Sequence, residues 1–506
     1  MEQRLAVIDL GSNSFRLVVF SHTPEWWKRT DEIYEPVRVG EGQEEGGPLR
    51  PGPVERALET IDLFAHFCRA SGIEHVRPLA TSAIREATNR DAFVAAAKER
   101  SGLDVEVLSR EREAHYGYLA AVNSTTLADG IALDIGGGSM QLTSVRDRRA
   151  TQARSWRLGA VVTTERFLNG DRVRPKHVKA LRAHVREELE QAPWLPRTGA
   201  RLTGVGGAVR NLAAAAMLAE ELPSYGVQGY LLHRDYLGDL IDEVVDMTPR
   251  ERRRIPGIKP ERGDLILGSA TVIDTVLEHV GADAIEVTQA GLREGAFFET
   301  LLAGQDEPLF DDVREASVRN LAAQYHPDRP HTEHVARLAL EIWDGLAAAG
   351  LHPGDPDERE LLWAAAMLHD VGTAVDYDDH HKHSRYLILN AGLPGYSPRE
   401  TAIIGQAARY HRKGRPAMRE FEPLAHRGDA ALLLRASASL RLAEQLERAR
   451  DQSVQHVRIG VDDGTVELAL EADADVTVSR WAAARQAELF RLAFDREMEV
   501  LTARTA

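Results

Sequence analysis

The stretch LDIGGGSMQL at residues 133–142 decides how this chain is expected to fold. An apolar strand runs into Asp134, three glycines and Ser139, and apolar alternation then resumes, which is the pattern of a β-hairpin. LAVIDLGSNSFRLVVF at 5–20 repeats this plan, with Asp9 before its turn and a second strand after it. Because no helix follows the glycines, the stretch is not a dinucleotide-binding fingerprint, and the sequence contains no GxxxxGKS or GxxxxGKT typical of a P-loop.

The spacing between the two hairpins, about one domain's length, predicts two similar α/β halves that face each other. After residue 303 the sequence changes character and predicts helices almost throughout. A short final piece combines a hairpin through Asp463 and Gly464 with a last helix over 481–501. We therefore divide the chain into residues 1–124, 125–303, 304–453 and 454–506.

The composition excludes several classes of protein. A chain of 506 residues with 43% hydrophobic and 28% charged residues is expected to form several soluble globular domains. The formal net charge of −16 argues against DNA binding, which needs a basic surface. No apolar run approaches the roughly 20 residues of a membrane helix, and the N-terminus does not resemble a signal peptide. The single cysteine, Cys68, is expected to be buried, and the absence of a disulfide partner favours a reducing compartment, the cytoplasm.

The glycine turns suit an anionic ligand. A turn without side chains lets successive backbone N–H groups approach a phosphate, and hydroxyl groups add further donors. Asp9 and Asp134 end the preceding strands, and a carboxylate beside phosphate is repulsive unless it holds a cation, which implies Mg²⁺. A third glycine loop precedes a helix, whose positive N-terminal end favours phosphate. The phosphate-binding candidates in these loops are Gly11, Ser12, Asn13, Ser14, Gly136, Gly137, Gly138, Ser139, Gly206 and Gly207.

Several segments, in this order, carry a resemblance: AVIDLGSNSFRL, LATSAIREATN, SREREAHYGY, LDIGGGSMQL and AGLREG. They resemble the exopolyphosphatase/guanosine pentaphosphate phosphohydrolase family, which belongs to the larger fold of actin, sugar kinases and chaperone ATPases. The resemblance implies an α/β fold of two ribonuclease H-like, actin-type lobes, followed by an all-α HD-like domain and a small α+β piece. It also implies a homodimer.

The same resemblance implies Mg²⁺-dependent hydrolysis of a phosphoanhydride bond. We expect an exopolyphosphatase that releases terminal orthophosphate from inorganic polyphosphate. The alternative at the same site is removal of the 5′-γ-phosphate of pppGpp, and residues 1–303 do not separate the two. A polyphosphate-dependent phosphotransferase and a non-catalytic alarmone or polyphosphate sensor are further alternatives, and the nearly complete set of motifs argues against the sensor.

The family's catalytic glutamate corresponds to Glu113 in REREAH. A carboxylate there can orient and deprotonate a water molecule in line with the terminal phosphorus. Arg16 and Arg85 are expected to clamp phosphate oxygens, because the planar guanidinium group suits them. Thr81 and Ser82 are expected to donate hydrogen bonds from their hydroxyl groups.

The sequence departs from the family pattern in two places. Gln141 stands where DIGGGSTE has a glutamate, so the candidate metal ligands are Asp9, Asp134 and a Gln141 that offers only a neutral oxygen. In the helical region AAMLHDVG resembles an HD motif. Its candidate ligands are His334, His369 and Asp370, with Glu444 where an aspartate is expected, and His380, His381 and His383 as further possible ligands. Because metal sites tolerate few ligand changes, we expect these histidines to make structural hydrogen bonds.

Overall fold

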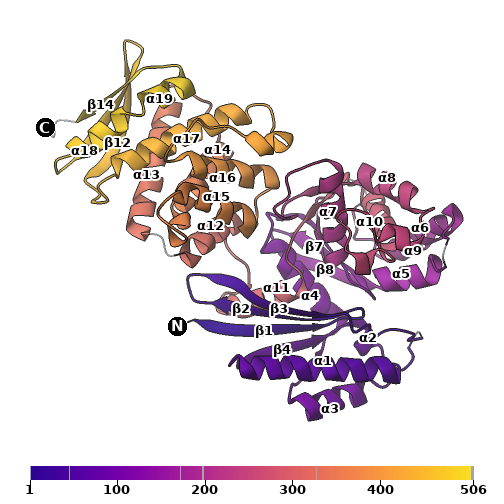
Figure 1. Ribbon diagram of the computed structural model, residues 1–506. Coiled ribbons are helices and arrows are strands. Elements are labelled where there is room, and N and C mark those ends of the chain that lie inside the picture. The colour runs from indigo at the N-terminus through magenta and orange to yellow at the C-terminus, as the bar shows by residue number, and fades with distance from the viewer. Residues whose placement is uncertain (1, 45, 171, 197–198, 326–327, 503–506) are drawn as a thin grey trace. The chain divides into compact units, whose positions relative to one another are not determined.

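The computed structural model describes residues 2–44, 46–170, 172–196, 199–325 and 328–502. The chain divides into two compact units, Met1–Val313 and Arg314–Ala506 (Figure 1). None of the helices in the described ranges is both long enough and apolar enough to cross a membrane.

The first sheet of the N-terminal unit has the strand order β3-β2-β1-β4-β5. β1 and β2 form the antiparallel hairpin expected around the first glycine turn, and β4 lies parallel to β1 on its other side. The strands are β1 (Gln3–Leu10), β2 (Phe15–His22), β3 (Trp27–Glu35), β4 (His75–Ala80) and β5 (Glu106–Val107). The helices of this half are α1 (Pro51–Ala70), α2 (Ser82–Arg85) and α3 (Arg90–Ser101), of which α1 and α3 lie on one side of the sheet (Figure 1). Cys68 on α1 is buried, as predicted, and burial raises the pKa of its thiol to about 11.

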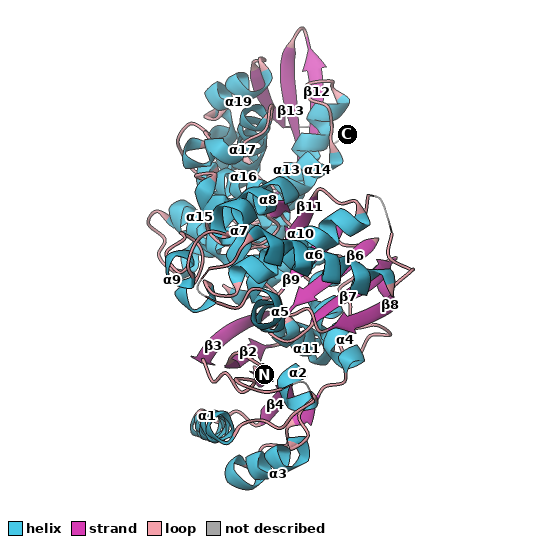
Figure 2. Ribbon diagram, turned by 90° about the vertical axis from the view of Figure 1, so that its right-hand side faces the viewer, coloured by secondary structure: helices cyan, strands magenta, loops and turns pink. Residues whose placement is uncertain are grey.

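The second sheet repeats this arrangement with one more strand, in the order β10-β11-β9-β6-β7-β8. β6 and β7 form the hairpin around the triple glycine, and β9 lies parallel to β6 as β4 lies parallel to β1. The strands are β6 (Gly130–Ile135), β7 (Met140–Arg146), β8 (Arg149–Trp156), β9 (Leu202–Val205), β10 (Leu231–His233) and β11 (Ala284–Val287). The helices from α4 onward are α4 (Arg110–Val122), α5 (Ala160–Phe167), α6 (Pro175–Glu190), α7 (Gly207–Ala219), α8 (Arg234–Val244), α9 (Pro249–Arg252), α10 (Ile266–Val280) and α11 (Leu292–Leu301), with a 3-10 turn at Pro260–Arg262. Figure 2 shows α6, α7, α8 and α10 together on one side of these strands.

Helices α4 and α11 pack against each other and join the two halves of the N-terminal unit. Leu5 and Val7 of β1 belong to the apolar core around these helices, whereas Ile8 belongs to the core beneath α1, as strand alternation requires. The Phe20 ring stacks on Phe297 of α11, with ring centroids 4.3 Å apart. The start of α4 is therefore fixed by an apolar core that contains residues from both halves.

The C-terminal unit is helical for most of its length. Its helices are α12 (Val313–Gln324), α13 (Arg329–Ala348), α14 (Pro356–Leu368), α15 (His380–Ala391), α16 (Pro398–Tyr410) and α17 (Asp429–Leu446), with 3-10 turns η2 (Val371–Ala374) and η3 (Arg419–Leu424). A proline in the first turn begins α13, α14 and α16, where its missing N–H costs no hydrogen bond. The predicted fold class, two α/β halves followed by a helical region and a small piece with strands, is confirmed.

The small C-terminal piece differs from the prediction in one element. Its hairpin is present as β12 (Val454–Asp462) and β13 (Thr465–Ala472), with Asp463 and Gly464 left-handed in the turn. The single helix predicted over 481–501 is wrong: the chain forms α18 (Thr477–Ala484), α19 (Ala487–Phe494) and then β14 (Met498–Thr502). β14 pairs parallel with β13, and Met498 and Val500 pack on the core while Glu499 is exposed. This short alternating segment becomes a strand only because β13 offers it backbone hydrogen-bond partners. From the sequence alone it looks like a continuation of the helical pattern before it, which is why the prediction failed.

Candidate active site

The two glycine turns are closed by the same hydrogen bond. The N–H of Gly11 donates to the carbonyl of Ser14 at 3.2 Å, and the N–H of Gly136 donates to the carbonyl of Ser139 at 2.9 Å. The two stretches that repeat in the sequence therefore also repeat in local structure.

The triple-glycine turn is bare because other segments lie against it. A Cβ atom on Gly137 would lie 3.6 Å from the Cβ of Ser12 in the first turn. A Cβ atom on Gly138 would collide with the Oγ of Ser82, the first residue of α2. Ser12 and Ser82 are themselves joined by a hydrogen bond between their hydroxyl groups at 3.0 Å. Glycine is therefore required at Gly138, where three segments meet.

A cleft of about 490 Å³ opens between the two halves, and both turns line it. Its carboxylates include Asp9 and Asp134, at the ends of β1 and β6, and Glu113 from the first turn of α4. The other predicted site residues that line it are Gly11, Ser12, Asn13, Ser14, Arg16, Thr81, Ser82, Gly136, Gly137, Ser139, Gln141, Gly206 and Gly207. Residues predicted from separate motifs thus lie in one site.

Glu113 is buried and both of its carboxylate oxygens are engaged. Arg85 donates through Nη1 to Oε2 of Glu113 at 2.6 Å, and the same nitrogen donates to the carbonyl of Leu108 at 3.1 Å. The hydroxyl of Ser139 donates to Oε1 at 3.2 Å. Ser109 caps α4 by accepting a hydrogen bond from a backbone N–H of the first turn, which fixes where the helix begins. The carboxylate is therefore held between an arginine behind it and the triple-glycine turn in front of it.

Two of the predicted phosphate-binding residues do not line this cleft. Arg85 lies beside Glu113, and its Nε and Nη2 are buried without a hydrogen-bond partner among the described residues. Gly138 instead lines a neighbouring cavity of about 750 Å³. The structure makes Arg85 the partner of Glu113. The expected contact between Arg85 and phosphate stays a prediction.

The strand-end carboxylates have perturbed pKa values. Burial, followed by the negative charge of Glu113, raises the pKa of Asp134 to about 7 against the opposing charge of Arg210. Burial also raises the pKa of Asp9, although Arg293 at 4.0 Å opposes this shift. A divalent cation would remove the cost of ionising both groups, and carboxylate oxygens are ligands that Mg²⁺ prefers.

These carboxylates do not form a compact metal cage. Within the described ranges, they are not among the groups of three ligand atoms that lie within 4.8 Å of one another. Mg²⁺ commonly uses one or two carboxylates and completes its coordination with water and substrate phosphate. Asp9 and Asp134 therefore fit Mg²⁺ as the protein part of such a site.

Gln141 lies beside the triple-glycine turn, as strand alternation predicts. The hairpin register places it opposite Asp134, and its Nε2 donates to the Oγ of Ser139 at 2.9 Å. The side chain is buried and lines the cleft. Its assignment as a metal ligand stays a prediction.

Sequence reasoning missed several cations that line the cleft. They are Arg29, Arg210, Lys259, Arg262 and Arg293. Arg210, in the first turn of α7, donates through Nη1 to the carbonyls of Gln289 and Ala290, each at 3.0 Å. Burial lowers its pKa to about 10, so it stays charged at neutral pH. Sequence signals for three of these residues were present, because Arg293 lies in AGLREG and both Lys259 and Arg262 lie in the basic run ERRRIPGIKPERGD at 251–264. A basic run by itself suggests only a solvated surface.

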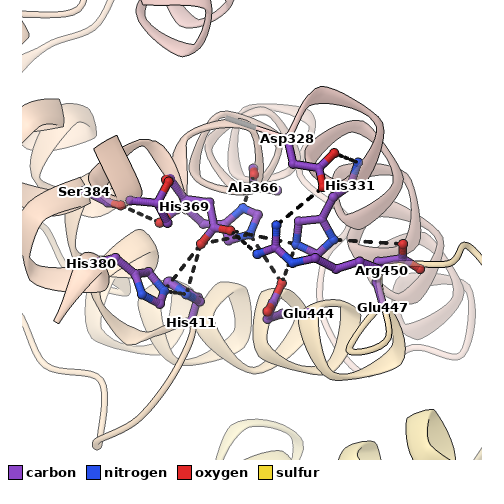
Figure 3. Close-up of polar contacts among 12 residues, drawn as sticks. Asp328, His331, Ala366, His369, His380, Ser384, His411, Glu444, Glu447 and Arg450 are labelled. Atoms are coloured by element: carbon purple, nitrogen blue, oxygen red, sulfur yellow. Dashed lines mark hydrogen bonds and ion pairs between the residues drawn. The ribbon is translucent and has the colours of Figure 1, made fainter. Parts of the chain in front are cut away.

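The C-terminal unit contains a second group of candidate residues. Figure 3 shows His331, His369, His380, His411 and Glu444 turned toward one another. The assignment of His334 to this group is wrong, because its Nε2 hydrogen-bonds to the carbonyl of Val454 at 2.9 Å, and His331 takes the expected place. The two histidines are nearly one turn apart on α13, so only the packing of neighbouring helices decides which one points inward. His411, which sequence reasoning missed, belongs to the group, while His381 and His383 do not.

Comparison with known proteins agrees with this arrangement. The profile of the Ppx/GppA phosphatase family matches residues 18–303, and that of Ppx/GppA phosphatase, domain III, matches residues 313–491. A guanosine-5′-triphosphate,3′-diphosphate pyrophosphatase of Vibrio vulnificus is 27% identical over 477 residues, which cover 92% of each chain. A protein of the same name from Vibrio parahaemolyticus is 27% identical over 474 residues.

Solved structures resemble part of the chain. The Aquifex aeolicus member of the Ppx/GppA family aligns with a TM-score of 0.54 at 26% identity, covering 61% of this chain and 100% of that one. An exopolyphosphatase from Cytophaga hutchinsonii aligns with a TM-score of 0.55 at 26% identity, with the same coverage. The chain therefore belongs to the Ppx/GppA phosphatase family and is a phosphoanhydride hydrolase.

Proposed function

We propose that the cleft removes the terminal 5′-phosphate of pppGpp by attack of water. The observation that carries this proposal is the hydrogen bond from Ser139, at the end of the triple-glycine turn, to the carboxylate of Glu113. This hydrogen bond places the Glu113 carboxylate, which can activate a water molecule, beside the triple-glycine turn, whose backbone N–H groups suit phosphate. The relatives named guanosine-5′-triphosphate,3′-diphosphate pyrophosphatase support this choice of substrate, because the alignment covers 92% of this chain. The alignment with the Cytophaga exopolyphosphatase covers 61% of this chain.

The residues of the cleft have distinct tasks in this reaction. Backbone N–H groups of the two turns, together with Arg16, Arg210 and Arg293, hold the oxygens of the γ-phosphate. Glu113 accepts a proton from water as the water oxygen bonds to the γ-phosphorus, and the bond between that phosphorus and the bridging β-phosphate oxygen breaks. Orthophosphate and ppGpp leave, and Arg85 keeps the Glu113 carboxylate in position throughout. Mg²⁺ held by Asp9 and Asp134 would supply positive charge to the phosphate oxygens.

The substrate assignment is tested by measuring phosphate release from pppGpp, long-chain polyphosphate and ATP under the same conditions with Mg²⁺. We expect kcat/KM for pppGpp to exceed those for the other two by on the order of tenfold or more. A higher kcat/KM for polyphosphate would instead make the protein an exopolyphosphatase. Binding of pppGpp without phosphate release would identify a sensor.

Inorganic polyphosphate is the second candidate substrate of the same cleft. The neighbouring cavity of about 750 Å³ shares Ser12, Asn13 and Ser82 with the cleft, and its lining includes Arg38 and Arg110. A chain of phosphates longer than the cleft could extend along this second cavity. If both substrates use Glu113, polyphosphate should inhibit pppGpp hydrolysis competitively.

We also propose that the chain forms a homodimer, which the family resemblance implies. Val478, Trp481 and Leu492 on the last two helices are exposed large apolar side chains, with Trp481 60% exposed. Such side chains are typical of protein interfaces. Light scattering should give twice the chain mass, and Trp481→Glu should give the chain mass if these helices form the interface.

A further inference from the structure

Six buried side chains converge inside the C-terminal unit. They are His331, His369, Asp370, His380, His411 and Glu444. Two groups of three have metal-ligand spacing, with their ligand atoms within 4.8 Å of one another, and Asp370 belongs to both. The first group adds His331 and His369, and the second adds His380 and His411.

Three of the imidazole rings are oriented in the same way. The Nδ1 atoms of His369, His380 and His411 lie 2.6, 2.8 and 2.6 Å from the carbonyl oxygen of the residue three positions earlier. A carbonyl can only accept, so each Nδ1 carries a proton and each Nε2 faces the cluster, where it can bind a metal ion when it carries no proton. The Nε2 of His369 is buried without a hydrogen-bond partner among the described residues. Metal-binding histidines are held by this kind of hydrogen bond.

The contact between His380 and His411 needs a proton or a metal ion between the two Nε2 atoms. Their Nε2 atoms lie 3.0 Å apart, and with both Nδ1 atoms protonated, two neutral rings would oppose lone pair to lone pair. Oδ1 of Asp370 lies 3.4 Å from the Nε2 of His380 and 3.9 Å from that of His411. Ligand atoms bound at about 2.1 Å to one metal ion are roughly 3.0–3.4 Å apart, close to the observed spacing.

The remaining ligands lie on the other side of Asp370. Its Oδ2 lies 3.9 Å from the Nε2 of His331. Oε2 of Glu444 lies 3.1 Å from the Nε2 of His331 and 3.4 Å from the Nε2 of His369. The longer side chain of Glu444 thus reaches the place for which the sequence pattern predicted an aspartate.

We propose that this cluster is a two-metal centre in which Asp370 bridges the ions. One ion is held by His331, His369 and Glu444, and the other by His380 and His411. Ligand sets that mix imidazole with carboxylate favour first-row transition ions such as Mn²⁺, Fe²⁺, Co²⁺ or Zn²⁺ over Mg²⁺. The centre is separate from the cleft of the N-terminal unit, since every ligand belongs to the C-terminal unit.

The surroundings of the centre indicate the class of ligand that reaches it. A cavity of about 530 Å³ is lined by Asp370 and by Arg412, Arg448 and Arg450. Arg450 donates through Nη2 to Oδ2 of Asp370 at 2.7 Å. Two cations beside a set of arginines suit a phosphate group, whose oxygens can bridge the ions while guanidinium groups bind the others. The ligand is therefore a phosphate-bearing molecule.

The metal content of the full-length protein tests the centre. The protein is stripped with a chelator, incubated with Mn²⁺, desalted and measured by mass spectrometry of the metal, alongside its variants. We expect about two Mn²⁺ ions per chain, with a spin-coupled Mn²⁺ pair visible by paramagnetic resonance. Asp370→Asn should lose both ions, and His331→Ala should lose one. Adding inorganic phosphate should change the resonance spectrum of the loaded protein, and an unchanged spectrum would refute the phosphate class of ligand.

Matched variants separate metal binding from folding. His334→Ala and His381→Ala remove neighbouring histidines outside the group and should keep both ions. Glu444→Gln preserves size and should still lose one ion, while the stripped variant should have the same unfolding temperature as the stripped wild-type protein. Wild-type protein that retains no more Mn²⁺ than Asp370→Asn would overturn the proposal. Equal losses in His334→Ala and His331→Ala would do the same.

Discussion

At the scale of single residues, Glu113 and Asp134 show how one cleft gives two carboxylates different surroundings. Glu113 is bound by Arg85 and by Ser139, and these two hydrogen bonds fix the direction of its carboxylate. Asp134 lines the cleft, and burial raises its pKa to about 7. The first carboxylate is thus placed to act on water, while the second is placed to bind a cation.

Glu113→Gln keeps the size of the side chain and its hydrogen bonds but removes the base. We expect kcat for phosphate release to fall by roughly 10²–10⁴, while the substrate still binds. Single-turnover phosphate release and equilibrium binding of pppGpp measure the two effects separately. A variant with near-normal turnover would remove Glu113 from the mechanism.

Asp134→Asn tests the raised pKa in protein without divalent cations. The folded state keeps the Asp134 proton up to about pH 7, whereas the ordinary carboxyl loses it near 3.8. The wild-type protein should therefore lose stability relative to Asp134→Asn as pH rises from about 4 to about 7, with no further loss above this window. We expect a total of about 1–3 kcal/mol, since the side chain faces water in the cleft. Urea unfolding at a series of pH values measures this, and a constant difference between the two proteins would contradict it.

At the scale of elements, the site depends on how closely turns and helix ends approach one another. The triple-glycine turn touches the first turn and the start of α2 with no room for a side chain at Gly138. The same packing brings Ser139 to Glu113 at the start of α4. The geometry of the phosphate cradle and the position of the catalytic carboxylate are therefore coupled.

Gly138→Ala should destabilise the N-terminal unit by about 1–3 kcal/mol, because the added methyl group collides with Ser82. Ser82→Gly in the same chain should restore part of this loss, since it removes the obstructing side chain. Gly136→Ala is the matched control, because its nearest neighbour would be 3.6 Å away, an ordinary contact. Thermal unfolding of the three variants gives the comparison. Equal losses for Gly136→Ala and Gly138→Ala would show that the collision with Ser82 is not the cause.

At the scale of the whole molecule, the phosphatase cleft lies entirely within the first compact unit. The segment after α11 still belongs to that unit. The Phe310 ring stacks on Trp27 at 4.8 Å, and the N–H of Phe310 donates to the side chain of Asn123 at 2.9 Å. The structural boundary at residue 313 thus includes contacts that a boundary at 303 would cut.

A protein of residues 1–313 should keep kcat for pppGpp within about tenfold of the full chain, because it contains every residue of the cleft. A protein ending at residue 303 should be less stable by roughly 2–5 kcal/mol, since it lacks the buried contacts of Phe310. Phosphate-release assays and thermal unfolding of both proteins test this. Loss of activity in the 1–313 protein, if it is folded by circular dichroism, would show that the C-terminal unit takes part in the reaction.

The sequence by itself determined the repeated hairpins, the change from two α/β halves to a helical region, and the position of Glu113, Asp9 and Asp134 at the ends of elements. These follow from periodicity, glycine placement and spacing, which are local properties of the chain. Only the tertiary structure decided that Arg85 binds Glu113, that Arg210 and Arg293 enter the cleft, and that β14 is a strand. It also decided that His331 and His411 join the cluster instead of His334. The physical reason is that the partner of a side chain depends on which elements pack against its own, and residues far apart in the chain supply these partners.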